Sequence, residues 1–185
     1  MARVKRVKLL IDTIKGFHDI GNLANPRMAN IIPNIIKLLE KDEPSDRTFL
    51  LGDCHDLDDE EFQMFPPHCV EGTEETEIID ELRIPFVKAR GQYIPKTRYS
   101  GFFNTELELI LEHLKPEQVI VVGVCTDICI LHTVADLRNR DYRVIIPRDC
   151  VETFDAPNHP ADQHNQWALN HMQYVLGAIV VDHID

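Results

Sequence analysis

The sequence predicts an α/β fold, a mainly parallel sheet with helices on both faces, from two observations. Short apolar runs rich in Val and Ile alternate along the chain with segments of helical periodicity. The runs are almost continuously apolar rather than alternately polar, as expected for strands that are buried on both faces of a sheet. No internal repeat, low-complexity tract or linker interrupts the pattern, so residues 1–185 are predicted to form one domain.

The predicted strands are short apolar runs, and most end at polar or turn-forming residues. Their bounds are Val7–Asp12, Thr48–Asp53, Ile84–Lys88, Gln118–Gly123, Arg143–Pro147 and Ala178–Asp182. The predicted helices lie between most of them. Thr105–Leu114 shows the clearest helical pattern, with Leu107, Ile110, Leu111 and Leu114 on one face. The other predicted helices are Met28–Glu40, Thr126–Arg138 and Asn165–Leu176, the last of which Gly177 would end.

Composition narrows the function classes. Of 185 residues, 44% are hydrophobic and 27% charged, which is ordinary for a globular protein and argues against disorder and membrane spans. The net charge of −12 opposes binding to nucleic acid. The basic start, Met1–Arg6, is followed only by a short apolar stretch containing Lys8, so we expect no signal peptide and a cytoplasmic location. Most of the five cysteines are then expected to be thiols.

In open parallel sheets, ligands bind beyond the carboxyl ends of the strands, so polar residues there are candidates for chemistry. Asp12 ends the first strand, although a carboxylate in this position also suits a turn or helix cap. The segment from Cys54 to Arg83 lacks clear periodicity and carries many acidic residues, and loops of this length are usually functional or disordered.

The second strand ends in Asp53-Cys54-His55, in which Asp53 and His55 point to the same side of an extended chain. A carboxylate and an imidazole so placed suit a divalent ion such as zinc, iron or manganese. Further ligands could come from Glu60 or Glu61 and from His68, which follows two prolines. Two alternatives remain at this point: the acidic run is solvated surface, or Cys54 and Cys69 form a structural zinc site with histidines.

Two later segments offer a cation and a nucleophile. Lys96 lies in a run of small and aromatic residues that could line a pocket or lie on the surface. The fourth strand leads into Cys125-Thr-Asp-Ile-Cys129 at the start of a predicted helix, where backbone N–H groups and the helix dipole would lower a thiol pKa and hold an oxyanion. The alternative is that both cysteines are small buried hydrophobic residues.

Taken together, these segments resemble the isochorismatase-like cysteine hydrolases, and among them the nicotinamidases. The resemblance covers nearly the whole chain and rests on DCH with EFQMFPPHC, on PKTRYSGFFNTEL, and on GVCTDICILHTVAD. It implies a three-layer α/β/α fold with a mainly parallel sheet of about six strands. It also implies a catalytic triad of Asp12, Lys96 and Cys129, with an oxyanion hole formed by the N–H groups of Cys125, after a cis peptide bond, and of Cys129.

The resemblance further implies one divalent metal ion, with zinc favoured over iron or manganese. Its ligands map to Asp53, His55, Glu61 and His68, where Glu61 takes a position that is His in some nicotinamidases. Aromatic residues that line the nicotinamide pocket map to Phe17, Phe65 and Tyr99. Two segments depart from the family pattern: no acid precedes Phe17, and 151–165 is unusually rich in charge.

The implied activity is hydrolysis of nicotinamide to nicotinate and ammonia, a step in pyridine nucleotide salvage, by a homo-oligomer (a dimer or tetramer) without nucleic-acid or membrane partners. Two alternatives stay open: a related amidase for another small heteroaromatic or carbamoyl compound, and a silent binding module of the same fold. The intact triad positions argue against the binding module. Isochorismate hydrolysis itself is less favoured, since those relatives lack the metal ligands.

Overall fold

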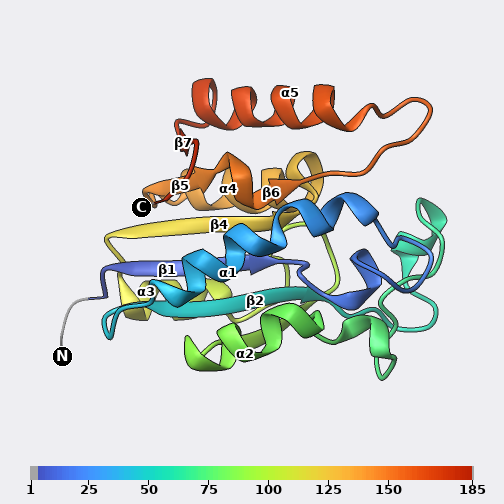
Figure 1. Ribbon diagram of the computed structural model, residues 1–185, viewed down its shortest axis with the longest axis horizontal. Coiled ribbons are helices and arrows are strands. Elements are labelled where there is room, and N and C mark those ends of the chain that lie inside the picture. Colours follow the sequence, from blue (N-terminus) through green and yellow to red (C-terminus); the bar gives the residue numbers. More distant parts are fainter. Residues whose placement is uncertain (1–3, 185) are drawn as a thin grey trace.

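A parallel sheet of seven strands organises the part of the chain that this computed structural model describes, residues 4–184 (Figure 1). The ends of the predicted domain, residues 1–3 and 185, lie outside the described residues. Six strands follow one another in the order β3-β2-β1-β4-β5-β7, and β6 pairs with β4. Their bounds are β1 Arg6–Ile11, β2 Arg47–Asp53, β3 Gln92–Lys96, β4 Gln118–Val124, β5 Val144–Pro147, β6 Val151–Glu152 and β7 Ile179–Val181.

Helices cover both faces of the sheet, which confirms the predicted three-layer fold. One face packs against α1 (Ile32–Glu40) and α2 (Asp80–Lys88), and the other against α3 (Leu107–Leu114), α4 (Leu131–Asn139) and α5 (Ala161–Tyr174). In Figure 1, α5 runs along the top of the view and α2 lies at the bottom. Neighbouring residues of a strand enter opposite layers: Leu9 joins the α3–α5 side and Leu10 the α1–α2 side.

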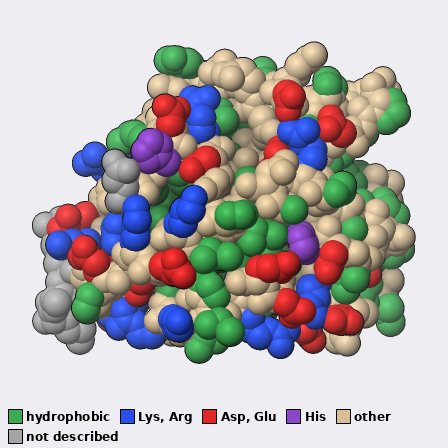
Figure 2. All heavy atoms as spheres, in the orientation of Figure 1, with side chains coloured by type: hydrophobic (Ala, Val, Ile, Leu, Met, Phe, Trp, Pro, Cys, Tyr) green, Lys and Arg blue, Asp and Glu red, His purple; other side chains and the backbone are tan. Residues whose placement is uncertain are grey.

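The outer surface carries charge of both signs. Figure 2 shows acidic and basic side chains interspersed over the face in view, with apolar side chains between them. None of the helices within residues 4–184 has the length and apolar character to cross a membrane.

The predicted strand Ile84–Lys88 is wrong, because this segment is the second half of α2. Leu82 and Phe86 are four residues apart, lie on one helical face and are buried, whereas Ile84 and Val87 are exposed. The strand that fills this place in the sheet is β3, which comes after α2 and was not predicted. β6 was likewise not predicted.

The long segment after β2 contains two short 3-10 helices, Glu60–Gln63 and Glu74–Thr76, before α2 begins. The predicted helix Thr126–Arg138 starts as a π-helical turn, Thr126–Ile130, in which the N–H of Ile130 donates to the carbonyl of Cys125. This wider turn brings Cys129 back toward the end of β4.

The strand order places four chemically important strand ends side by side. β3, β2, β1 and β4 are consecutive neighbours, and all pairs are parallel, so their carboxyl ends meet at one edge. Gly123 permits the closest approach: its φ is +118°, and a Cβ there would lie 2.0 Å from the carbonyl oxygen of Ile11.

A buried lysine at the opposite end of β1 gives a stability prediction. Lys8 is fully buried, and its ammonium lies 3.0 Å from Asp42 and 3.4 Å from Asp46. Asp46 also binds Arg6 at 2.6 Å. Asp46→Ala is expected to lower the free energy of unfolding by about 3 kcal/mol, because it removes one partner from buried charge. Urea denaturation measures the change.

The matched control is Glu108→Ala, which removes a half-exposed ion pair with Arg140. Exposed pairs of this kind contribute less than about 1 kcal/mol. Equal losses in the two variants would contradict the importance given to Asp46.

Candidate active site

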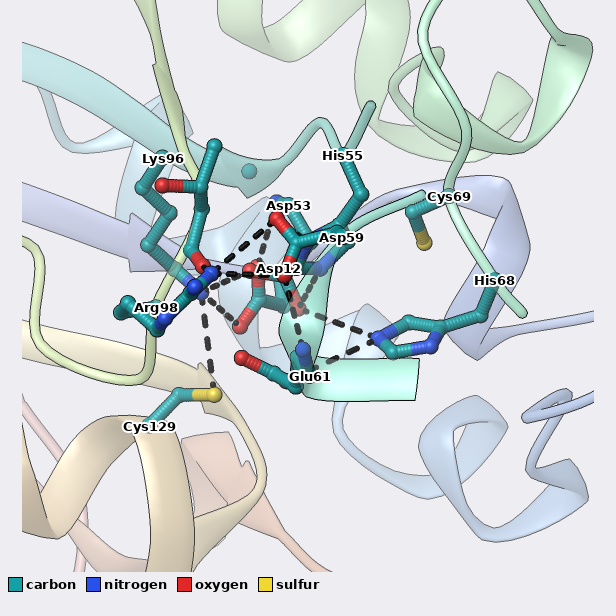
Figure 3. Close-up of polar contacts among 12 residues, drawn as sticks. Asp12, Asp53, His55, Asp59, Glu61, His68, Cys69, Lys96, Arg98 and Cys129 are labelled. Carbon is teal, nitrogen blue, oxygen red and sulfur yellow. Dashed lines mark hydrogen bonds and ion pairs between the residues drawn. The ribbon is translucent and has the colours of Figure 1, made fainter. Parts of the chain in front are cut away.

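Asp12, Asp53 and Lys96 come together because they end three neighbouring strands. Asp53 and Lys96 are partners in the β2–β3 register, and Asp12 directly follows β1. Cys129 reaches the same point from the π-helical turn after β4. Figure 3 shows the Lys96 ammonium between the Cys129 sulfur and the two carboxylates. All four residues are buried.

Lys96 is the hub of this group. Its Nζ lies 2.9 Å from Asp12 Oδ2 and 3.7 Å from Cys129 Sγ, and it also donates to Asp53 Oδ1. The ammonium is therefore shared between the predicted triad and the predicted metal site. A single positive charge faces two carboxylates and a thiol in a region without exposed surface.

Asp12 is held by the backbone around it. Its φ is +51°, a left-handed conformation that Asp tolerates better than most residues, and its N–H donates to Leu51 O at 2.8 Å. The N–H of Asp53 donates to Asp12 Oδ1 at 2.9 Å. Oδ2 instead faces the Lys96 ammonium, and the Cys129 sulfur lies within 4.8 Å of the Asp12 carboxylate.

The surroundings raise the pKa values of both Asp12 and Cys129. Burial and the charge of Asp53 raise the pKa of Asp12 and Lys96 lowers it, which together bring this pKa to about 6. Burial would lower the pKa of Lys96, but the carboxylates of Asp12 and Asp53 outweigh it and raise that pKa well above its usual value. Lys96 is therefore a permanent cation.

The prediction that the Cys129 pKa is lowered is wrong. Burial raises this pKa well above its usual value; Lys96 lowers it, while Asp12 and Asp53 raise it. Cys129 is consequently a thiol, and the buried carboxylate of Asp12 lies beside it.

Cys125 lies one residue before the π-helical turn, and the Val124–Cys125 peptide bond is cis, as the resemblance implies. The carbonyl of Cys125 accepts from the N–H groups of Ile128 and Ile130. Cys125 and Cys129 both line the same pocket. Both predicted oxyanion-hole residues thus lie at its wall.

Four predicted metal ligands form a second group beside the first. Asp53, His55, Glu61 and His68 are buried, and each offers one donor atom within 4.8 Å of the others. Asp53 and His55 come from the end of β2, Glu61 from a 3-10 helix and His68 from the segment after Pro66-Pro67. Asp53 Oδ2 is 3.7 Å from both His55 Nε2 and His68 Nε2.

The outer contacts turn these side chains toward a common centre. His68 Nδ1 lies 2.9 Å from Pro66 O, and His55 Nδ1 lies 3.1 Å from Asp59, which Arg98 holds at 2.8 Å. Such contacts fix the ring so that Nε2 is free to bind a metal. His55 Nε2 and Glu61 Oε2 are buried without hydrogen-bond partners, which suits a divalent cation bound among them.

The sequence left two alternatives for this region, a solvated acidic surface and a structural zinc site with Cys54 and Cys69. Glu61 is buried and faces the group, whereas Glu60 is exposed, so the acidic run is only partly a solvated surface. Cys54 and Cys69 belong to none of the potential metal-binding groups found among residues 4–184. The N–H of Cys69 instead donates to Glu75.

A pocket of about 350 Å³ connects the two groups. Cys129 lies in its wall together with Asp53, Glu61 and His68. The three predicted aromatic residues also line it, and Phe65 stands edge-on to both Tyr99 and His68. An apolar cavity with few convergent polar groups is typical of a small-molecule site. Additional lining residues that the sequence analysis did not identify include Asn22, Arg27 and Phe154.

The positioning residues Asp59 and Arg98 were also missed. Asp59 lies in the acidic run and Arg98 two residues after Lys96, so both were visible next to predicted site residues. Only the fold shows that Asp59 contacts both His55 and Arg98.

Comparison with known proteins identifies the family. The isochorismatase domain model matches residues 7–185. The chain belongs to the isochorismatase family. It is similar to a pyrazinamidase/nicotinamidase from Streptococcus mutans UA159, with 30% identity, a TM-score of 0.86 and coverage of 96% of this chain and 100% of that one.

Two further solved structures are similar to the present chain. N-carbamoylsarcosine amidase from Thermoplasma acidophilum shares 30% identity, with a TM-score of 0.83 and coverage of 98% of this chain and 99% of the other. A pyrazinamidase of Pyrococcus horikoshii, described in complex with zinc, shares 25% identity, with a TM-score of 0.81 and coverage of 96% and 98%.

Proposed function

We propose that this hydrolase converts nicotinamide to nicotinate and ammonia through a thioester on Cys129. The observation that carries the proposal is the single pocket that joins the thiol to a buried cluster of metal-ligand side chains between aromatic walls. A heteroaromatic amide offers one group to each part: its carboxamide to Cys129 and its ring nitrogen to the cluster. The similarity to amidases supports an amide as the bond that is cleaved.

The first half-reaction forms the thioester. Asp12 takes the proton of the Cys129 thiol, and the sulfur attacks the carboxamide carbon. The N–H groups of Cys125 and Cys129 hold the oxyanion, while Lys96 stabilises the developing negative charge nearby. Asp12 returns the proton to the amide nitrogen, the C–N bond breaks and ammonia leaves.

The second half-reaction releases the acid. Asp12, again a carboxylate, accepts a proton from water as its oxygen attacks the thioester carbon. The C–S bond breaks, the proton on Asp12 returns to the sulfur, and the acid product loses its own proton to solvent as it leaves the pocket as nicotinate. Lys96 keeps its charge throughout, because its raised pKa holds the proton at neutral pH.

Asp53, His55, Glu61 and His68 would hold one divalent ion, for which zinc fits the mixed imidazole and carboxylate set. When bound, the ion supplies a Lewis acid that can accept the ring nitrogen of the substrate and so orient its carboxamide. Phe17, Phe65 and Tyr99 pack against the ring. We further propose that residues 1–185 form one domain of a cytoplasmic homo-oligomer.

Ammonia release from nicotinamide by the purified, metal-supplemented protein tests the function. The matched comparison is benzamide, which has the same carboxamide and no ring nitrogen. We expect turnover of nicotinamide and a large loss of kcat/KM with benzamide. Turnover of N-carbamoylsarcosine with none of nicotinamide would instead favour the carbamoyl-amidase alternative, which the second structural similarity supports.

Glu61→Ala is expected to weaken zinc binding by at least tenfold and to raise KM for nicotinamide. Glu61 is the cluster ligand whose buried Oε2 has no other partner. Calorimetric titration of metal-free protein with zinc measures the affinity. Glu60→Ala is the control, because the Glu60 side chain is next to Glu61 in sequence but exposed. Equal zinc affinity in both variants would show that Glu61 is not a ligand.

A further inference from the structure

A second group of potential ligands lies beside the proposed nucleophile, and two of its three members come from the charged segment 151–165, which departs from the family pattern. Asp127 belongs to the π-helical turn of Cys129, His159 to the loop before α5, and His164 to the first turn of α5. One donor atom of each residue lies within 4.8 Å of the other two. We propose that these three residues bind a second divalent transition-metal ion of the zinc class, separate from the Asp53 cluster.

The orientation of His159 carries the proposal. Its Nδ1 lies 2.8 Å from the carbonyl oxygen of Phe154, and its Nε2 lies 2.7 Å from Asp127 Oδ2. Both neighbours are hydrogen-bond acceptors, whereas a neutral imidazole has one N–H only. A metal ion bound to Nε2 and Asp127 would satisfy the acceptor that this single N–H leaves unpaired. The remaining contacts favour the metal ion.

The same carboxylate oxygen faces a second imidazole. His164 Nδ1 lies 3.2 Å from Asp127 Oδ2, and the two imidazole rings stack with centroids 3.7 Å apart. Two imidazole rings so placed can present lone pairs to one ion. Two imidazoles and a carboxylate are a common ligand set for zinc and related metals.

The outer contacts repeat those of the first cluster. Nδ1 of His159 faces a backbone carbonyl just as Nδ1 of His68 faces Pro66 O, and each leaves Nε2 toward carboxylate oxygens. The other oxygen of Asp127 accepts from Thr153 Oγ1 at 2.6 Å, which fixes the carboxylate. Metal-binding imidazoles and carboxylates characteristically have such second contacts.

The group is open to solvent on one side. The Asp127 side chain is 8% exposed, that of His159 17% and that of His164 34%. An ion can therefore enter from solvent and keep water as an additional ligand, as at zinc sites with three protein ligands.

Metal binding here would fix part of the substrate pocket. The Phe154 ring stacks on His159 with centroids 4.0 Å apart and an angle of 3°, and Phe154 lines the pocket that contains Cys129. An ion held between Asp127, His159 and His164 would tie the 153–164 segment to the nucleophile turn and α5. Its expected effect on catalysis is on KM, through the position of Phe154.

Titration of metal-free protein with Zn²⁺, followed by calorimetry, tests the proposal without reference to activity. We expect His164→Asn and His159→Asn each to bind one equivalent less than the unaltered chain. His171→Asn is the control, because His171 lies on the same helix, stacks on Trp167 and belongs to neither cluster. It is expected to keep the full stoichiometry.

The two metal sites are separated by the Asp53→Asn variant, which is expected to lose zinc at the first cluster and keep the equivalent that His164→Asn removes. Circular dichroism confirms that each variant is folded, and the visible absorption of bound Co²⁺ gives a second readout for His164→Asn. Zinc stoichiometry unchanged in both His159→Asn and His164→Asn would overturn the proposal.

Discussion

Cys129→Ala is expected to abolish nicotinamide hydrolysis, with a loss in kcat of about 10⁴-fold or more, as for removal of other catalytic nucleophiles. In the proposed reaction the Cys129 sulfur forms the thioester, and Lys96 Nζ lies 3.7 Å from this sulfur. Ammonia release measures the loss. The same variant should form no thioester when the protein is quenched during turnover and analysed by mass spectrometry.

Cys125→Ala is the matched control, because Cys125 lines the same pocket but contributes only its backbone N–H to the proposed reaction. This variant should keep much of the activity. Iodoacetamide in limiting amount should modify Cys129 before the other thiols, since Asp12 can remove its proton. Labelling of Cys54 or Cys150 first, with an active Cys129→Ala variant, would contradict the assignment of the nucleophile.

Asp12→Asn is expected to lower kcat by about 10²–10⁴-fold, the range for loss of a general acid–base group. The asparagine oxygen can still accept from the N–H of Asp53, so the backbone contact is kept while proton transfer is lost. Alkylation of Cys129 at pH 7 should also become slower, because the thiol, whose pKa is raised, no longer has a base beside it.

The raised pKa of Asp12 also predicts the direction in which activity changes with pH. Asp12 must be a carboxylate to accept the thiol proton, and its pKa is raised to about 6. The kcat/KM of the unaltered enzyme should therefore fall as the pH decreases through about 6, and Asp12→Asn should lack this acid limb. Near-normal turnover of Asp12→Asn would show that Asp12 has only a structural role and would contradict the proposed mechanism.

The site region was predictable because parallel strands deliver their last residues to one edge. Asp12, Asp53 and the Cys125–Cys129 segment each follow an apolar run that is indeed a strand. Lys96 also ends a strand, but its strand was not recognised. Gln92–Lys96 has only Ile94 and Lys96 buried and contains Pro95, a residue that strands accept mainly at sheet edges.

The error at Ile84–Lys88 has a related cause. A short apolar run fits a buried strand and one side of a helix equally well, and only the longer pattern from Leu82 to Phe86 distinguishes them. In the structure, Ile84 is 67% exposed and Val87 68% exposed, so the apolar residues that suggested a strand are on the solvent side of α2.

Two details of the site depended on the fold itself. Glu60 and Glu61 are adjacent in sequence, and the 3-10 helix turns only Glu61 inward. The Cys129 pKa depends on burial and on the charges of Lys96, Asp12 and Asp53, which lie far from Cys129 in the sequence. The spacing of residues along the sequence does not show which way a loop side chain points. Nor does it show the electrostatic effect of carboxylates that are far apart in sequence and close in space.

Because β3 is an edge strand, the candidate active site is expected to be less stable against local unfolding than the centre of the sheet. β1 has paired strands on both sides, whereas β3 pairs only with β2 and carries Lys96 at its end. Edge segments with few partners open locally at lower free energy than a central strand. Opening of β3 alone would remove the ammonium while β1 and β4 stay folded. Under mild denaturant, amidase activity is therefore expected to disappear, and β3 amides to exchange with solvent, before the core of the molecule unfolds.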